Sequence, residues 1–78
     1  MQYLTNEEQF KEVLNNEEIS RIKDPELRKL RYEYWKKFTD AFEDEQNISD
    51  SEFVKLTERL SEEEKRDLDK YKINKGLV

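Results

Sequence analysis

The chain contains no cysteine and no histidine among its 78 residues. The missing cysteines exclude disulfides, and the two absences together exclude metal sites built from sulfur or imidazole ligands. Catalysis by a histidine base or a cysteine nucleophile is excluded for the same reason. With one glycine and one proline, the chain also has few of the residues that form β-hairpin turns. We therefore expect neither a disulfide-stabilised domain nor an all-β fold.

Long apolar segments are also missing. No apolar run approaches the ~18 residues that indicate a membrane-spanning helix. The N-terminal stretch MQYLTNEEQF is acidic rather than apolar, unlike a signal peptide. The sequence has no glycine-rich phosphate loop and no nucleophile motif. We expect no membrane segment, no enzyme activity and no cofactor, and a cytoplasmic location follows by default.

Charge is what the chain has in abundance. Charged residues make up 45% of the chain and hydrophobic residues 33%, with 15 basic and 20 acidic side chains and a net charge of −5. Four Tyr, four Phe and one Trp argue against simple disorder. The charges alternate in blocks: net −4 over residues 1–20, +4 over 21–39, −8 over 40–64 and +3 over 65–78. The small net charge therefore hides two basic regions.

Signals for helix starts punctuate the first third of the chain. Thr5 followed by Glu8 fits a capping box, which predicts a helix at about residues 6–15 with Phe10, Val13 and Leu14 on one side. Next, Asn16 is expected to cap a short helical turn that buries two isoleucines, at positions 19 and 22.

Asp24 and Pro25 predict the next helix, because aspartate is a good cap and proline suits the first helical position. We expect this helix to run to about residue 44 and to be the longest in the chain. Its apolar residues fall on one continuous side at the helical spacing. They are Leu27, Leu30, Tyr34, Trp35, Phe38, Ala41 and Phe42.

A second clear start lies at Ser49 and Glu52, which form another possible capping box, with Ile48 and Phe53 in hydrophobic-staple positions. A third possible box begins at Ser61. Residues 49–73 can therefore form either one helix or two. Further along, Leu68, Tyr71 and Ile73 are candidates for the buried side, and Gly76 suits a C-terminal stop.

These elements together predict an all-α fold, a small bundle of four to five helices around one long central helix at about residues 25–44. We expect a single helical domain over residues 1–75, with residues 76–78 as a frayed tail. The supply of apolar residues is small for a stable core. A homodimer, or an obligate partner, would bury additional surface.

Arg31 does not fit the helix pattern, because it projects into the apolar side of the predicted helix. A charged group there must be paired, stacked on an aromatic ring such as Trp35, or at the surface. Arg31 is therefore either a residue at the edge of the core, paired with a carboxylate or extending to solvent, or an anchor for an acidic partner.

The acidic segment from Ala41 to Phe53 resembles the second half of a calcium-binding loop, with Glu52 in the final bidentate position. Its first half does not match, because Ala41 stands where an aspartate ligand is needed and Gln46 where glycine permits the sharp turn. The helix-start signals at Ser49 account for the same residues. We predict no metal site.

Two functions are compatible with this pattern. The first is a small, acidic, non-enzymatic regulatory protein that binds another protein through charged helical faces. A partner with a basic surface would match this acidic chain. Its candidate residues are Arg31, Tyr32, Trp35, Asp40, Glu43, Asp44 and Glu45. The alternative is a nucleic-acid-binding protein that uses the basic and aromatic helix at 28–37. Its candidate residues are Arg28, Lys29, Arg31, Lys36 and Lys37.

Overall fold

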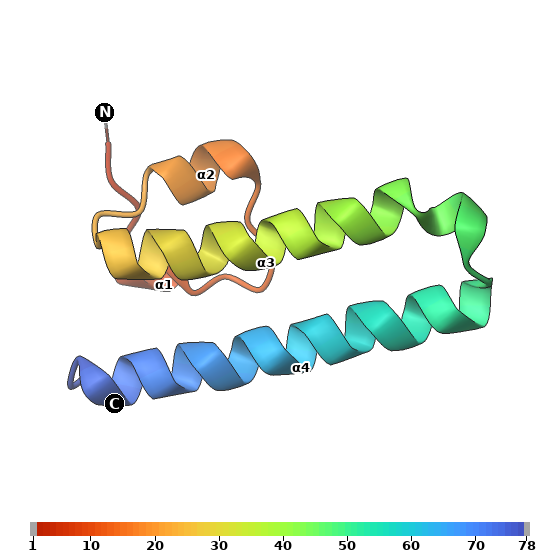
Figure 1. Ribbon diagram of the computed structural model, residues 1–78. Coiled ribbons are helices and arrows are strands. Elements are labelled where there is room, and N and C mark those ends of the chain that lie inside the picture. The colour runs from red at the N-terminus through yellow and green to blue at the C-terminus, as the bar shows by residue number, and fades with distance from the viewer. Residues whose placement is uncertain (1, 78) are drawn as a thin grey trace. The chain divides into compact units, whose positions relative to one another are not determined.

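The computed structural model describes residues 2–77, and this part of the chain is all-helical, without a strand. The elements in chain order are α1 (Asn6–Gln9), α2 (Asn16–Ser20), α3 (Pro25–Glu43), the 3-10 turn η1 (Glu45–Asn47) and α4 (Asp50–Asn74) (Figure 1). The all-α class is confirmed, and of the four or five α-helices expected, residues 2–77 contain four. None of the helices described is long and apolar enough to cross a membrane.

The chain divides into two compact units, Met1–Trp35 (unit 1) and Lys36–Val78 (unit 2). The division falls inside α3, so unit 1 holds α1, α2 and the first part of α3, whereas unit 2 holds the end of α3, η1 and α4. The assembly of all helices into one bundle around a central helix stays a prediction.

The first helix begins where the sequence predicts but ends earlier. Thr5 and Glu8 form both bonds of the capping box, at 3.2 Å and 3.0 Å. The expectation of a helix to residue 15 is wrong, because α1 ends at Gln9. Its physical reason is tertiary: the main-chain carbonyl of Lys11 accepts a hydrogen bond from the Arg31 guanidinium instead of from a helical amide. In this non-helical segment Val13 is exposed.

The second helix is capped one residue earlier than predicted. The side chain of Asn15, not Asn16, accepts a hydrogen bond from the main-chain amide of Glu18 at 2.8 Å. In return, the Glu18 carboxylate accepts a hydrogen bond from the main-chain amide of Asn15. This box fixes Asn15 in an extended conformation, which is a second reason why no helix passes through residue 15. The predicted burial of the two isoleucines is confirmed. The buried apolar residues of unit 1 are Leu4, Leu14, Ile19, Ile22, Leu27 and Tyr34.

The third helix matches its predicted bounds to within one residue at its end. Asp24 accepts the amide of Glu26 at 2.9 Å, and Pro25 stands in the first position. The predicted apolar side is only partly buried: Leu27, Tyr34 and Ala41 are buried, whereas Phe42 is 58% exposed. Phe42 lies in the last turn of α3, where fewer neighbouring residues can bury its side chain.

The fourth helix is a single element of 25 residues and passes through Ser61 without interruption. The expectation that the helix after Pro25 is the longest is therefore wrong, since α3 has 19 residues. Leu60, Leu68 and Tyr71 are buried at helical spacing on both sides of Ser61. One unbroken buried side favours one helix, because a cap at Ser61 would need extended backbone there.

Both ends of α4 carry the residues that terminate helices. Ser49 accepts the amide of Glu52 at 3.2 Å. At the other end, Gly76 has a φ of 70°, which glycine adopts without steric cost. The amide of Leu77 donates to the carbonyl of Lys72 at 2.8 Å, the bond typical of a Schellman motif. Gly76 is thus the predicted stop, while Ile73, expected on the buried side, is exposed.

Candidate interaction surface

The connection between α3 and α4, within unit 2, exposes apolar side chains. The rings of Phe42 and Phe53 lie 5.2 Å apart between centroids, at an interplanar angle of 55°. Phe42 is 58% exposed, Phe53 is partly exposed, and Val54 on the next position of α4 is 50% exposed. Figure 1 shows the end of α3 joined to the start of α4 through η1. The aromatic pair that these two helix ends carry is partly exposed to water.

Acidic side chains accompany this aromatic pair, and residues 40–54 contain no lysine or arginine. Five carboxylates of this stretch are exposed, and none of the five forms an ion pair with a residue that the structure describes. These five are Asp40, Glu43, Asp44, Asp50 and Glu52. A sixth acid, Glu45, belongs to η1, and its side chain lies outside the described part of the structure.

Two of these acids stand at the unfavourable end of a helix. Asp40 and Glu43 lie in the last turn of α3, which contains no basic residue. The carboxyl end of a helix carries partial negative charge, so acids there destabilise the helix by a few tenths of a kcal/mol each. The acids in the first turn of α4, Asp50 and Glu52, are placed favourably. We name this combined surface, formed by Phe42, Phe53, Val54 and the five exposed acids, the acidic-aromatic surface.

Arg31 belongs to unit 1 and is not part of the acidic-aromatic surface. It is not an exposed anchor. Its side chain is 2% exposed, and its Nη2 donates to the carbonyl of Lys11 at 2.6 Å. A longer contact of 3.5 Å reaches the carbonyl of Glu12. The guanidinium therefore holds the non-helical segment after α1 against α3, and the interpretation of Arg31 as an exposed anchor for a partner is corrected accordingly.

Tyr32 and Trp35, the two aromatic candidates of unit 1, form a stacked pair. Their ring centroids are 5.7 Å apart at an interplanar angle of 28°. Tyr32 is exposed and Trp35 is partly exposed. The candidate protein-binding residues thus divide between the units, with this pair in unit 1 and the acids of the α3–α4 connection in unit 2.

The candidate nucleic-acid residues do not form one exposed set. Arg31 is buried, and Arg28 donates through Nη1 to the carbonyl of Ile22 at 3.2 Å. Lys29 is exposed in unit 1, while Lys36 and Lys37 are exposed in unit 2. Two of the five cationic side chains therefore donate hydrogen bonds to main-chain carbonyls of unit 1.

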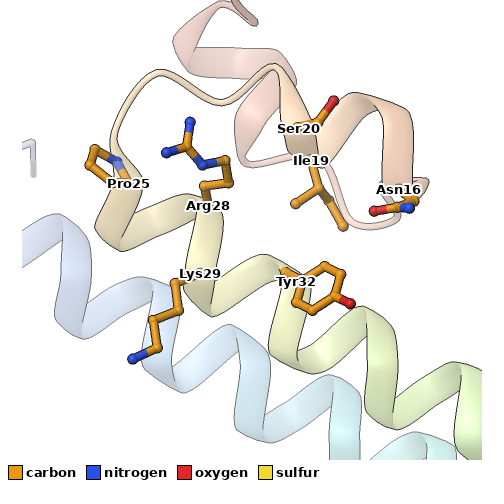
Figure 2. Close-up of a pocket in the computed structure, with 7 residues that line it drawn as sticks. All are labelled: Asn16, Ile19, Ser20, Pro25, Arg28, Lys29 and Tyr32. Atoms are coloured by element: carbon orange, nitrogen blue, oxygen red, sulfur yellow. The ribbon is translucent and has the colours of Figure 1, made fainter.

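A shallow, open pocket of about 480 Å³ lies between α2 and α3 in unit 1. Figure 2 shows Ile19 above Tyr32, and Lys29 extending from α3 away from α2. Its lining residues are Asn16, Ile19, Ser20, Pro25, Arg28, Lys29 and Tyr32. One lining cation is already engaged, because the Arg28 guanidinium donates to the carbonyl of Ile22. The described residues hold no cluster of acids suited to a metal ion.

The aromatic part of the acidic-aromatic surface was not anticipated from the sequence, which placed Phe42 on the apolar side of the helix after Pro25 and Phe53 in a hydrophobic-staple position. A signal was nevertheless present. Phe42 is the last apolar residue of its helical stripe and is followed directly by three acids. A side chain at the end of a helix has fewer neighbouring residues that can bury it.

Comparison of the chain with protein-family models, with curated proteins and with solved structures finds no match in any of the three.

Proposed function

We propose that this chain is a small, acidic, non-enzymatic interaction protein that binds a partner protein through the acidic surface of unit 2. The partner presents a basic surface, and electrostatic attraction steers the two together. A regulatory role and a cytoplasmic location belong to the same proposal and rest on composition alone.

One observation carries the proposal: five exposed carboxylates around the α3–α4 connection form no ion pair with any described residue. Asp40 and Glu43 also oppose the dipole of α3, so they lower the stability of the fold. Side chains that oppose stability are expected where function requires them. A basic partner would supply the missing counter-charges.

A protein partner is favoured over nucleic acid by the state of the cations. Nucleic-acid affinity needs several exposed cations that can reach phosphates. Arg31 and Arg28 bond to carbonyls of unit 1, and the exposed acids of unit 2 repel phosphate. The alternative function therefore loses two of its five candidate side chains.

The test is a titration of the full chain with a lysine-rich synthetic peptide, and separately with DNA and RNA, at low and high salt. We expect the peptide to bind at low salt and its affinity to fall as salt rises, because screening weakens contacts between exposed charges. We expect no binding of nucleic acid at either salt concentration.

A matched pair of variants locates the surface. Neutralising Asp40→Asn, Glu43→Gln and Asp44→Asn is expected to weaken peptide binding by about tenfold, the sum of three modest surface interactions. The control neutralises three exposed acids of unit 1 and changes the net charge equally. It combines Glu7→Gln, Glu12→Gln and Glu33→Gln.

If the control weakens binding as much as the first variant, net charge rather than this surface governs association. Salt-sensitive binding of DNA or RNA, with no binding of the peptide, would replace the proposal by the nucleic-acid function.

A further inference from the structure

We infer that the acidic-aromatic surface binds a basic amphipathic helix, whose apolar side chains pack on Phe42, Phe53 and Val54. The lysines or arginines of that helix then reach the surrounding carboxylates. The inference rests on the proposed function and adds that the partner is recognised by apolar contact as well as by charge.

The apolar part of the surface is the first step of the argument. Single exposed apolar residues are ordinary on protein surfaces. Here Phe42 is 58% exposed and also contacts the ring of Phe53, and Val54 is 50% exposed. A partner that covers an exposed phenylalanine gains free energy in proportion to the apolar area removed from water.

The acids are placed so that one ligand can meet both kinds of contact. Asp50 precedes Val54 by one helical turn on α4, and residues four apart share one side of a helix. On α3, Glu43 directly follows Phe42 in the last turn. A helix that presents apolar residues along one side and cations along its borders matches this arrangement.

Charge complementarity also decides against other occupants. A second copy of the chain would bring the same carboxylates opposite each other, and like charges that face one another disfavour binding. Residues 40–54 contain no cation to relieve that repulsion. An anionic ligand is disfavoured for the same reason.

The experiment compares two synthetic helical peptides with equal numbers of lysines at the same positions. In one peptide leucines occupy every third and fourth position, and in the other glutamines replace these leucines. Titrated into the full chain at physiological salt, the leucine peptide is expected to bind at least about tenfold more tightly, the effect of burying one or two apolar side chains.

Variants then separate a docking role from a structural one. Phe42→Gln is expected to remove most of the advantage of the leucine peptide while leaving the affinity for the glutamine peptide unchanged. Val54→Thr, which keeps the side-chain shape, is expected to reduce the advantage several-fold. Its matched control is Val13→Thr in unit 1, at a valine that is 75% exposed, and no change is expected there.

Circular dichroism and urea unfolding of each variant check that the fold is retained, and Val54→Thr serves if Phe42→Gln unfolds. Equal binding of the two peptides by the wild-type chain would overturn this inference and leave the proposed function standing. Failure of both peptides to bind at physiological salt would overturn this inference, and their failure to bind at low salt as well would overturn the proposed function. Self-association of the chain that Phe42→Gln abolishes would assign the surface to a second copy instead.

Discussion

The guanidinium of Arg31 joins two parts of unit 1 that are distant in sequence. It donates to the carbonyl of Lys11 at 2.6 Å, and its side chain is buried. Hydrogen bonds that involve a charged group contribute more than neutral ones, and removing the donor leaves the part-buried carbonyl of Lys11 without this bond. At the scale of single residues, this side chain determines where the segment after α1 lies.

Replacing Arg31 tests this role directly. Arg31→Met keeps most of the apolar volume but removes the donor, and we expect it to lower the free energy of unfolding by about 2 kcal/mol. The measurement is equilibrium urea unfolding of the full chain. As a control, Arg59→Met at an exposed position of α4 is expected to change stability by less than about 0.5 kcal/mol. An equal effect of the two substitutions would show that Arg31 has no special role in the fold.

Two glutamates of the capping boxes are expected to make the stability of the fold depend on pH. The hydrogen bond from the Thr5 main-chain amide lowers the pKa of Glu8 below its ordinary value of 4.5. The hydrogen bond from the Lys11 ammonium, 2.7 Å from the carboxylate, lowers the pKa of Glu18 in the same direction. A carboxyl group with a lowered pKa in the folded state stabilises the fold above its unfolded pKa, and this stabilisation is lost as pH falls.

We therefore expect the free energy of unfolding to decrease as the pH is lowered below about 4.5, the ordinary pKa of both groups. The check is urea unfolding at a series of pH values between neutral and strongly acidic. In the double variant Glu8→Gln and Glu18→Gln, the side-chain amides retain the capping bonds but do not titrate. Its stability should depend less on pH, and an unchanged pH profile would contradict the assignment.

At the scale of elements, two serines in similar sequence settings have different roles. Ser49 and Ser61 are each followed three residues later by a glutamate, the spacing of a capping box. Ser49 caps α4 by accepting the amide of Glu52, whereas Ser61 lies inside the helix. The difference follows from the buried residues, which continue on one side of α4 through Ser61.

Alanine at each position distinguishes the two roles. Ser49→Ala removes a helix cap and is expected to lower the free energy of unfolding by about 1 kcal/mol. Ser61→Ala places the best helix former in an exposed helix interior and is expected to raise it by about 0.5 kcal/mol. Urea unfolding of both variants gives the two signs. Loss of stability in Ser61→Ala comparable to that in Ser49→Ala would indicate two helices instead of one.

At the scale of the whole molecule, charge is distributed in blocks rather than balanced locally. Residues 40–64 carry a net charge of −8, and the exposed acids at the α3–α4 connection have no ion pair within the described residues. Like charges held close together destabilise the folded state, and salt reduces this repulsion because it shortens the range of electrostatic interactions.

Adding salt is therefore expected to stabilise the wild-type chain more than the variant Asp40→Asn, Glu43→Gln and Asp44→Asn. The expected difference is about 0.5 kcal/mol between low and physiological ionic strength, since exposed charges interact weakly. Thermal unfolding of both proteins over a range of sodium chloride concentrations measures it. A larger gain for the neutralised variant would mean that these acids do not repel one another in the fold.

The sequence alone was sufficient for the helical class and for most helix starts. Capping residues act on amides a few positions away, so Thr5, Asp24 and Ser49 could be identified without knowledge of the fold. Gly76 was recognised as a stop for the same reason, since left-handed backbone is a local property.

Contacts between distant residues decided the rest. Arg31 donates a hydrogen bond to the Lys11 carbonyl, which in a longer first helix would accept a main-chain amide. The continuous buried side of α4 favours a helix that continues through Ser61. Burial likewise determined which residues belong to the candidate site. Helical periodicity placed Phe42 in the apolar stripe, but at the end of α3 the neighbouring segments leave its side chain exposed. Local capping depends on a few neighbouring residues, whereas exposure depends on every segment that packs nearby, and only the tertiary structure specifies those segments.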